Sequence, residues 1–151
     1  MRALIQRVKR SSVLIDRKTH SSIGKGILVF LGAKRGDDES DAIAVAEKCA
    51  GLRIFDDSDG KMNLSVCDVA GEVMVVSQFT LYGDTKRGNR PSYSEAAPPE
   101  IAEPLYTKFV EEMRRRAGAH KVQTGVFRAF MEVELVNGGP VTVQVESKER
   151  T

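Results

Sequence analysis

The sequence predicts a single α/β domain in which a mainly antiparallel sheet, or an open barrel, packs against two main helices. Short apolar segments recur between turns rich in glycine, proline and aspartate, as is typical of strands. Two longer segments instead repeat apolar residues at helical spacing. A chain of 151 residues can bury one hydrophobic core without needing disulfide bonds or bound metals for stability. We therefore expect residues 1–151 to form one domain, with 146–151 as a flexible, charged tail.

The first elements are expected to be strands. Residues 3–8 and 12–15 are mostly apolar, and a polar stretch divides them into two strands that are followed by a turn over 16–20. Residues 27–31 form an unbroken apolar run with glycines before and after it. Such a run predicts a central strand that is buried on both faces.

The first helix is expected to begin at residues 36–38 and to end near Gly51. Asp37 and Asp38 supply capping oxygens and early negative charge for the exposed amide groups of the first turn. The apolar stripe of this helix consists of Ile43, Ala46, Cys49 and Ala50. The next expected elements are a short strand over 52–55, a turn over 56–60 and a strand over 73–81.

Residues 83–99 contain several prolines and glycines, so we expect a long loop. A second helix is expected to begin at Pro98 and Pro99 and to end at Gly118, because apolar residues recur at four-residue steps. These residues are Ile101, Leu105, Phe109 and Met113. Apolar and polar residues then alternate over 129–135 and over 141–145, on either side of an Asn-Gly-Gly-Pro segment at 137–140. This pattern predicts a hairpin.

Composition and charge exclude several classes of protein. The net charge of +2 is far below that of a protein that coats nucleic acid non-specifically. Residues 1–9 contain neither the apolar run of a signal peptide nor a membrane span, so we expect a cytoplasmic protein without a membrane partner. The 2 cysteines, Cys49 and Cys67, suit a reducing compartment, and we expect both to be inert thiols in the core.

Two segments contain combinations of residues that the formation of a β-sheet does not require. They are Ser-Gln-Phe-Thr-Leu at 77–81 and Asn-Gly-Gly-Pro-Val-Thr at 137–142. With these motifs the sequence resembles the D-aminoacyl-tRNA deacylases, the D-tyrosyl-tRNA deacylase family, whose members have an S-Q-F-T-L strand segment and an N-x-G-P-V-T turn. Further matches lie at 5–8, 62–65, 86–93 and 124–127. The resemblance therefore covers nearly the whole chain up to Val145.

The resemblance implies a homodimeric enzyme that hydrolyses the ester of D-aminoacyl-tRNA to free D-amino acid and tRNA, and that also hydrolyses mischarged glycyl-tRNA. It further implies a selectivity device at Gly139 and Pro140. In such deacylases the Gly-Pro peptide bond is cis, and the carbonyl groups of this pair reach the partner subunit's active site. There they exclude L side chains but do not exclude glycine. The residues alone predict an ordinary hairpin turn here, and they leave the isomer open.

Residues 77–80 are the candidate catalytic segment. On a strand, Ser77 and Phe79 would share one face while Gln78 and Thr80 share the other, so the second pair could enter one pocket. Strand propensity alone favours Thr80 as a β-branched residue that only fills the strand. The resemblance implies instead a pocket built mainly of backbone groups around all four residues, in which the 2′-hydroxyl of the terminal adenosine of the tRNA assists.

A covalent mechanism at Thr80 is not expected. The only histidines, His20 and His120, do not stand at a recognisable catalytic spacing, so no base would activate the hydroxyl. Oriented water and amide donors can suffice for an ester. No cofactor and no metal are expected, because the cysteines and histidines are scattered, and Asp56 with Asp57 is typical of a turn.

Recognition of tRNA is expected at Lys86, Arg87 and Arg90 in the long loop, where phosphates of the acceptor end could be neutralised, with Tyr93 as a stacking surface. A solvated loop explains these residues equally well. Arg7 resembles a family arginine that supports the Gly-Pro turn through its fork of donors.

Two other functions fit the same residues. A nucleic-acid-binding module without catalysis would use the sheet and the basic loop but would not turn over aminoacyl-tRNA. A related deacylase with a trans bond before Pro140 would also accept some L-aminoacyl-tRNAs, although the intact N-x-G-P-V-T motif argues against it. Turnover of D-tyrosyl-, L-tyrosyl- and glycyl-tRNA distinguishes these functions.

Overall fold

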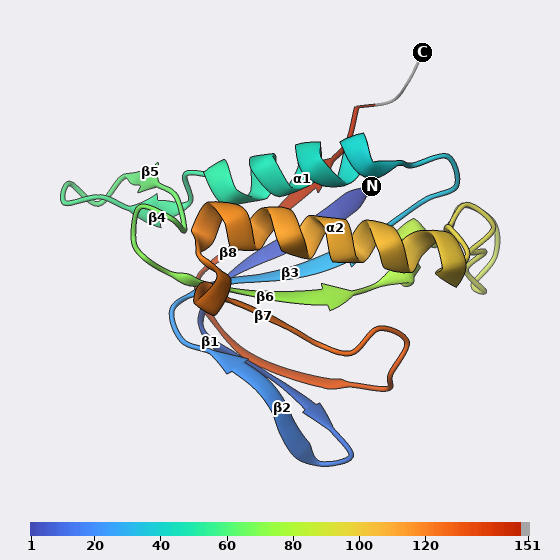
Figure 1. Ribbon diagram of the computed structural model, residues 1–151, viewed down its shortest axis with the longest axis horizontal. Helices are drawn as coiled ribbons and strands as arrows, with labels where there is room; N and C mark the ends of the chain where they lie inside the picture. The colour runs from blue at the N-terminus through green and yellow to red at the C-terminus, as the bar shows by residue number, and fades with distance from the viewer. Residues whose placement is uncertain (149–151) are drawn as a thin grey trace.

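The computed structural model describes residues 1–148 (Figure 1). Its elements in chain order are β1 (Arg2–Ile15), β2 (Lys18–Ile23), β3 (Gly26–Gly32), α1 (Glu39–Gly51), β4 (Phe55–Asp56), β5 (Met62–Leu64), β6 (Glu72–Ser77), a 3₁₀ helix (Phe79–Tyr82), α2 (Pro99–Ala117), a 3₁₀ turn (Ala119–Lys121), β7 (Val122–Thr124) and β8 (Glu132–Glu146). Two main helices and one large sheet confirm the predicted fold class. Neither of these helices is long and apolar enough to cross a membrane.

The sheet has the strand order β2–β1–β3–β6–β7, and β8 pairs with the remaining edge of β1. β1 is antiparallel to its three neighbours, whereas the β3–β6 and β6–β7 pairs are parallel. β4 and β5 form a separate two-stranded ribbon. β2 occupies part of the segment predicted as a turn, and β4 is shorter than the strand predicted over 52–55.

Apolar side chains fill both faces of the central strands. α1 and α2 lie side by side over one face of the sheet (Figure 1). Val29 of β3 and Val75 of β6 belong to the core beneath these helices, together with Phe109 of α2. Leu28 and Met74, the alternate residues, belong to a second core on the opposite face. Burial of each such side chain stabilises the fold by about 1.5–3 kcal/mol, and β3 is buried on both faces as predicted.

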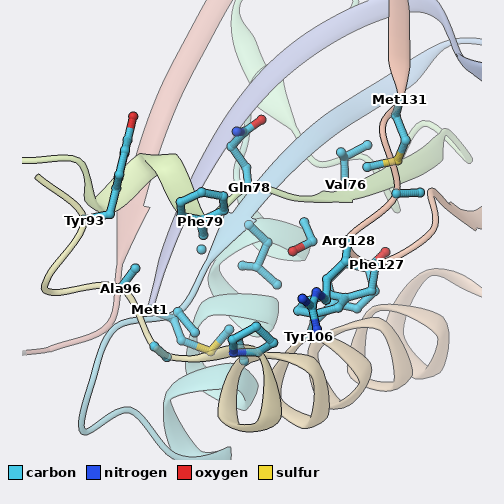
Figure 2. Close-up of a pocket in the computed structure, with 18 of the residues that line it drawn as sticks. Met1, Val76, Gln78, Phe79, Tyr93, Ala96, Tyr106, Phe127, Arg128 and Met131 are labelled. Carbon is cyan, nitrogen blue, oxygen red and sulfur yellow. The ribbon is translucent and has the colours of Figure 1, made fainter. Parts of the chain in front are cut away.

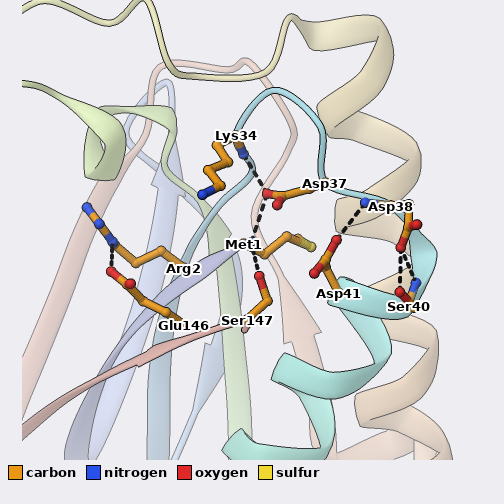
Figure 3. A network of polar contacts seen from close by, with 9 residues as sticks. All are labelled: Met1, Arg2, Lys34, Asp37, Asp38, Ser40, Asp41, Glu146 and Ser147. Atoms are coloured by element: carbon orange, nitrogen blue, oxygen red, sulfur yellow. Dashed lines mark hydrogen bonds and ion pairs between the residues drawn. The ribbon is translucent and has the colours of Figure 1, made fainter. Parts of the chain in front are cut away.

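Both helices lie where the sequence predicts them. The Asp38 carboxylate accepts a hydrogen bond from the Ser40 amide, and the Asp41 carboxylate accepts one from the Asp38 amide, each at 2.8 Å. This reciprocal capping box satisfies amides of the first turn of α1 (Figure 3). α2 ends at Ala117, with Gly118 as its C-cap, and buries three of the four predicted stripe residues, whereas Ile101, in its first turn, is exposed.

The hairpin predicted over 129–145 is wrong. β8 runs without reversal and pairs along almost all of β1, which is itself one strand of 14 residues rather than two. Residues 138–141 bulge out of β8 opposite Arg7, between the ladder partners of Gln6 and Val8. The long partner strand keeps the chain extended on both sides of the Asn-Gly-Gly-Pro segment, which local preferences alone direct to a turn.

The predicted tail starts later than expected. Glu146 closes β8, and the Ser147 amide donates a hydrogen bond to the Met1 carbonyl at 2.9 Å. The Met1 amine donates to the Ser147 hydroxyl at 2.6 Å and forms an ion pair with the Asp37 carboxylate at 2.8 Å (Figure 3). Both charges are almost fully shielded from water, and the ion pair links the start of β1 to the segment before α1. Residues 149–151 of the predicted tail lie outside the described residues.

Candidate active site

A cavity of about 630 Å³ opens where β3 and β6 end, beside α2 and the segment that leads into β8 (Figure 2). Its wall is mostly apolar and is formed by Met1, Leu31, Gly32, Ala33, Val76, Ser77, Gln78, Phe79, Tyr93, Ala96, Ala97, Pro99, Ala102, Tyr106, Phe127, Arg128, Ala129, Phe130, Met131 and Val133. The carboxyl ends of parallel strands are a common place for ligand sites, and the volume suits a small organic group. This cavity is therefore the candidate active site.

Three of the four predicted catalytic residues line the cavity. Ser77, Gln78 and Phe79 belong to its wall, whereas Thr80 does not. Gln78 is half-buried and Thr80 is exposed. The side-chain amide of Gln78 donates a hydrogen bond to the Thr80 hydroxyl. Thr80 can therefore orient Gln78 from outside the cavity.

The strand predicted over 73–81 ends early, at Ser77. Its partner β3 ends one residue after Leu31, so the following residues have no strand edge to pair with. The Gln78 amide still donates to the Leu31 carbonyl at 2.8 Å, but the chain then turns into a 3₁₀ helix. The predicted alternation of faces over 77–80 is therefore wrong, and three successive residues of this segment line the cavity.

An exposed aromatic pair stands at the cavity mouth. The rings of Phe79 and Tyr93 meet edge to face, with centroids 5.2 Å apart, and are 54% and 39% exposed. Tyr93 follows a loop that is closed by two backbone hydrogen bonds between Asp84 and Ser92, at 2.7 and 3.0 Å. The predicted tRNA-binding cations all lie exposed within this loop: Lys86, Arg87 and Arg90. The basic loop therefore begins and ends beside the cavity.

Tyr106 of α2 connects helix α2 to β6 and to Phe127 on the side of the cavity opposite Phe79. Its hydroxyl donates to the Val75 carbonyl at 3.0 Å, and the same carbonyl accepts the Gly125 amide at 3.1 Å. Its ring lies 5.8 Å from that of Phe127. Burial raises the pKa of Tyr106 to about 12, so the hydroxyl stays protonated and donates at neutral pH. No motif marks Tyr106 in the sequence, because it stands beside the apolar stripe of α2 without belonging to it.

Gly139 and Pro140 lie in the bulge of β8, where both are exposed and the peptide bond between them is cis. Arg7 holds this bulge: its Nε donates to the Gly138 carbonyl at 2.8 Å, and its Nη1 donates to the Ile54 carbonyl at 2.7 Å. The Arg7 side chain is only 16% exposed. The guanidinium therefore ties the bulge to the segment before β4.

The bulge is far from the cavity of the same chain. Along β3, Arg7 is aligned with Ile27, whereas Ser77 is aligned with Leu31. Four strand residues separate these positions by about 13 Å. The structure thus brings Arg7 to the Gly-Pro pair and brings Ser77 to the cavity, but it does not bring the two groups together within one chain.

A family model for D-Tyr-tRNA(Tyr) deacylase matches residues 4–146. The chain belongs to this family. The proteins named D-aminoacyl-tRNA deacylase of Thermotoga petrophila and Anaeromyxobacter dehalogenans are each 54% identical to it, over 99% and 98% of both chains respectively. The family assignment based on the motifs at 77–81 and 137–142 is therefore confirmed.

Two solved structures share the fold of this deacylase family member. One, named c-Myc DNA Unwinding Element Binding Protein, is 39% identical, with a TM-score of 0.94, and the match covers 99% of this chain and 100% of that one. Another, described as "Structural Analysis of a probable eukaryotic D-amino acid tRNA deacylase", has a TM-score of 0.83, and the match covers 96% of this chain and 98% of that one. Its identity of 15% shows a common fold alone.

Proposed function

We propose that this protein hydrolyses the ester bond of D-aminoacyl-tRNA and releases the D-amino acid and the tRNA. The observation that carries the proposal is the cavity of about 630 Å³ at the end of β6, whose wall contains Ser77, Gln78 and Phe79. Its volume suits an aminoacyl group with the terminal nucleoside. The apolar wall favours ester hydrolysis, because donors in a site with little water interact strongly with developing charge.

In the proposed reaction, a water oxygen bonds to the ester carbonyl carbon, and the bond from that carbon to the 3′-oxygen of the adenosine breaks. The proton from water ends on that 3′-oxygen. The amide of Phe79, a residue of the cavity wall, has no acceptor within the 3₁₀ helix, so we assign it as a donor for the oxyanion. Neither histidine is among the described residues of the cavity wall. We therefore assign the orientation of water to the 2′-hydroxyl of the substrate.

Selection for D-amino acids is assigned to Gly139 and Pro140 of a second copy of the chain. Both residues are exposed, and the cavity of their own chain lies about 13 Å away along β3. Backbone carbonyls placed next to the substrate Cα would overlap with any L side chain and would leave glycine unhindered. A homodimer and activity on glycyl-tRNA follow from this assignment.

The tRNA is held in this proposal by Lys86, Arg87 and Arg90, which neutralise phosphates of the acceptor end. Their loop begins and ends beside the cavity mouth, so a phosphate on the loop and an ester in the cavity can be engaged together. Aminoacyl-tRNA is used in the cytoplasm, and we place the enzyme there.

The test is a parallel incubation of the protein with D-tyrosyl-tRNA, L-tyrosyl-tRNA and glycyl-tRNA, with the loss of ester followed in each. D-tyrosyl- and glycyl-tRNA should be hydrolysed, and L-tyrosyl-tRNA should stay intact. Equal hydrolysis of the D and L esters would contradict the selectivity, and stable esters in all three would contradict the enzyme. Sedimentation equilibrium of the same preparation tests for the homodimer.

A nucleic-acid-binding module without catalysis is the second candidate function. The structural relative named c-Myc DNA Unwinding Element Binding Protein, at 39% identity, favours it. A binder of this kind would leave the ester of D-tyrosyl-tRNA intact or would protect it from spontaneous hydrolysis. The same incubation therefore separates the two functions.

A further inference from the structure

Two side chains at the mouth of the cavity have no role in the proposed hydrolysis. Arg128 and Phe130 belong to the cavity wall, and both are exposed, Phe130 to 87%. The geometry points to a binding site for the single-stranded 3′ end of the tRNA, in which Arg128 holds a phosphodiester and Phe130 stacks on a base. This inference rests on the proposed deacylase function and assigns the RNA side of the same cavity.

Arg128 has the only charged side chain among the described residues that line the cavity. Within residues 1–148 its guanidinium forms no hydrogen bond and no ion pair, so all of its donors are available. Arg7, by contrast, is engaged by two backbone carbonyls. A guanidinium presents a planar fork of donors that matches two oxygens of a phosphate. An unpaired arginine on an apolar wall therefore suits an anionic ligand.

The chemistry of the substrate decides which part of it meets Arg128. The α-ammonium of the aminoacyl group is positive and would be repelled by the guanidinium, whereas the phosphodiester before the terminal adenosine is negative. Figure 2 shows Arg128 with Phe127 and Tyr106 on one side of the cavity, and Gln78 and Phe79 on the other. The ester therefore lies toward Gln78 and Phe79, and the phosphodiester before the terminal adenosine lies toward Arg128.

The backbone at Arg128 has an unusual conformation. Its φ is +66°, in the left-handed region that residues other than glycine seldom adopt. Neighbouring contacts accompany this conformation: the Ala129 amide donates to the Val126 carbonyl at 3.2 Å, and the Phe127 ring packs against Tyr106. Arg128 therefore stands in a turn that lies in the cavity wall.

Phe130 is suited to stacking on a nucleobase. Phe79 and Tyr93, the other exposed aromatic residues of the wall, contact each other, whereas Phe130 has no aromatic partner among the described residues. Proteins that bind single-stranded RNA stack its unpaired bases on such aromatic rings. The terminal unpaired nucleotides of tRNA offer both a base and a phosphate within reach of one short loop.

The sharpest test compares Arg128→Gly with Arg17→Gly. Arg17 is also an exposed arginine, its φ is likewise +66°, and it lies between β1 and β2 rather than in the cavity wall. Both substitutions remove one positive charge and relieve the same backbone strain, so neither should unfold the protein. Arg128→Gly should raise KM for D-tyrosyl-tRNA about fivefold or more. It should also lower the log–log salt slope of tRNA binding by about 0.7, and Arg17→Gly should do neither.

Two further measurements assign the ligand groups. On 3′-O-D-tyrosyl-adenosine, which has no phosphate, the KM values of Arg128→Gly and Arg17→Gly should converge. Phe130→Ala should raise KM for D-tyrosyl-tRNA about fivefold or more, and Phe130→Tyr should restore it, because both aromatic rings stack. Met62→Ala is the control, since Met62 is 56% exposed and lies on β5, away from the cavity wall.

The outcomes separate this inference from the function on which it rests. If the wild-type protein hydrolyses D-tyrosyl-tRNA but Arg128→Gly has the KM and salt slope of Arg17→Gly, the phosphate site is wrong and the deacylase stands. If Phe130→Ala has the KM of Met62→Ala, the stacking role is wrong. If the wild-type protein leaves D-tyrosyl-tRNA intact, the proposed function and this inference both fail.

Discussion

The guanidinium of Arg7 donates a hydrogen bond to the carbonyl oxygen of Gly138, 2.8 Å away and 131 residues later in the chain. The same side chain donates to the Ile54 carbonyl at 2.7 Å and lies 3.7 Å from the Asp56 carboxylate. One side chain thus connects the bulge of β8, the start of β4 and the middle of β1. The conformation of the Gly-Pro segment therefore depends on a residue near the other end of the sequence.

Replacement of Arg7 by lysine should lower the free energy of unfolding by about 1–2 kcal/mol, because an ammonium cannot reach both carbonyls in the geometry of the planar fork. Urea unfolding measures the change. Arg10→Lys is the matched control, since Arg10 lies exposed on the same strand. Equal stability of the two variants would show that the Arg7 contacts do not hold the bulge.

Gly139→Ala should be more damaging than an alanine substitution elsewhere. Gly139 has a φ of +129°, and an added Cβ would stand 2.8 Å from Nη2 of Arg7, which two hydrogen bonds hold in place. We expect the free energy of unfolding to fall by about 1–3 kcal/mol and hydrolysis of D-tyrosyl-tRNA to decrease. Gly51→Ala is the control, because its Cβ would meet no atom within 4 Å. Full activity of Gly139→Ala would contradict the proposed role of Gly139 in selectivity.

Hydrolysis should depend on the 2′-hydroxyl of the terminal adenosine. A tRNA that ends in 2′-deoxyadenosine, with D-tyrosine on its 3′-oxygen, should be hydrolysed at least about 100-fold more slowly, because a positioned proton-transfer group is lost. Its binding to the protein, measured with the uncharged RNA, should be unchanged. Undiminished turnover would contradict assistance by the substrate and would direct the search to a base on the protein.

Neutralising Lys86, Arg87 and Arg90 together should weaken tRNA binding. Each lost phosphate contact should lower the log–log slope of affinity against salt by about 0.7–0.9, while the preference for D over L esters stays the same. The control removes three exposed cations of the β1–β2 hairpin, namely Arg10, Arg17 and Lys18. If both triple variants change the slope equally, the loop has no specific role in binding.

The two cysteines should differ in reactivity, because only one of them is a core thiol. Cys49 is buried, and burial raises its pKa to about 12, whereas Cys67 is exposed, contrary to expectation. Partial desolvation and the negative charge of Asp68 also raise the Cys67 pKa, so its thiolate fraction is below that of free cysteine and increases as the pH rises. A thiol reagent should label one equivalent in the native protein and two in urea. Two equivalents in the native protein would contradict this burial.

Both helices and the buried strand β3 could be predicted from the sequence because their signals are local. The capping box at Asp38 and the four-residue spacing of Leu105, Phe109 and Met113 involve residues one or two turns apart. The motif at 77–81 likewise marked a segment that lies beside a strand end and contributes to the cavity wall. The motif could be recognised from residue types alone, because these do not depend on the rest of the chain.

Strand ends and the assembled cavity depend on partners that are distant in the sequence. β6 stops at Ser77 because β3 offers no further edge, and the segment over 137–142 stays extended because β1 pairs on both sides of it. Tyr106 and Arg128 face residues 77–79 only because α2 and the loop before β8 pack against the end of β6. Local preferences favour a turn at Asn-Gly-Gly-Pro, but the free energy of burying a shared core outweighs them. It also compensates for the entropy lost when strands that are distant in the sequence pair with each other.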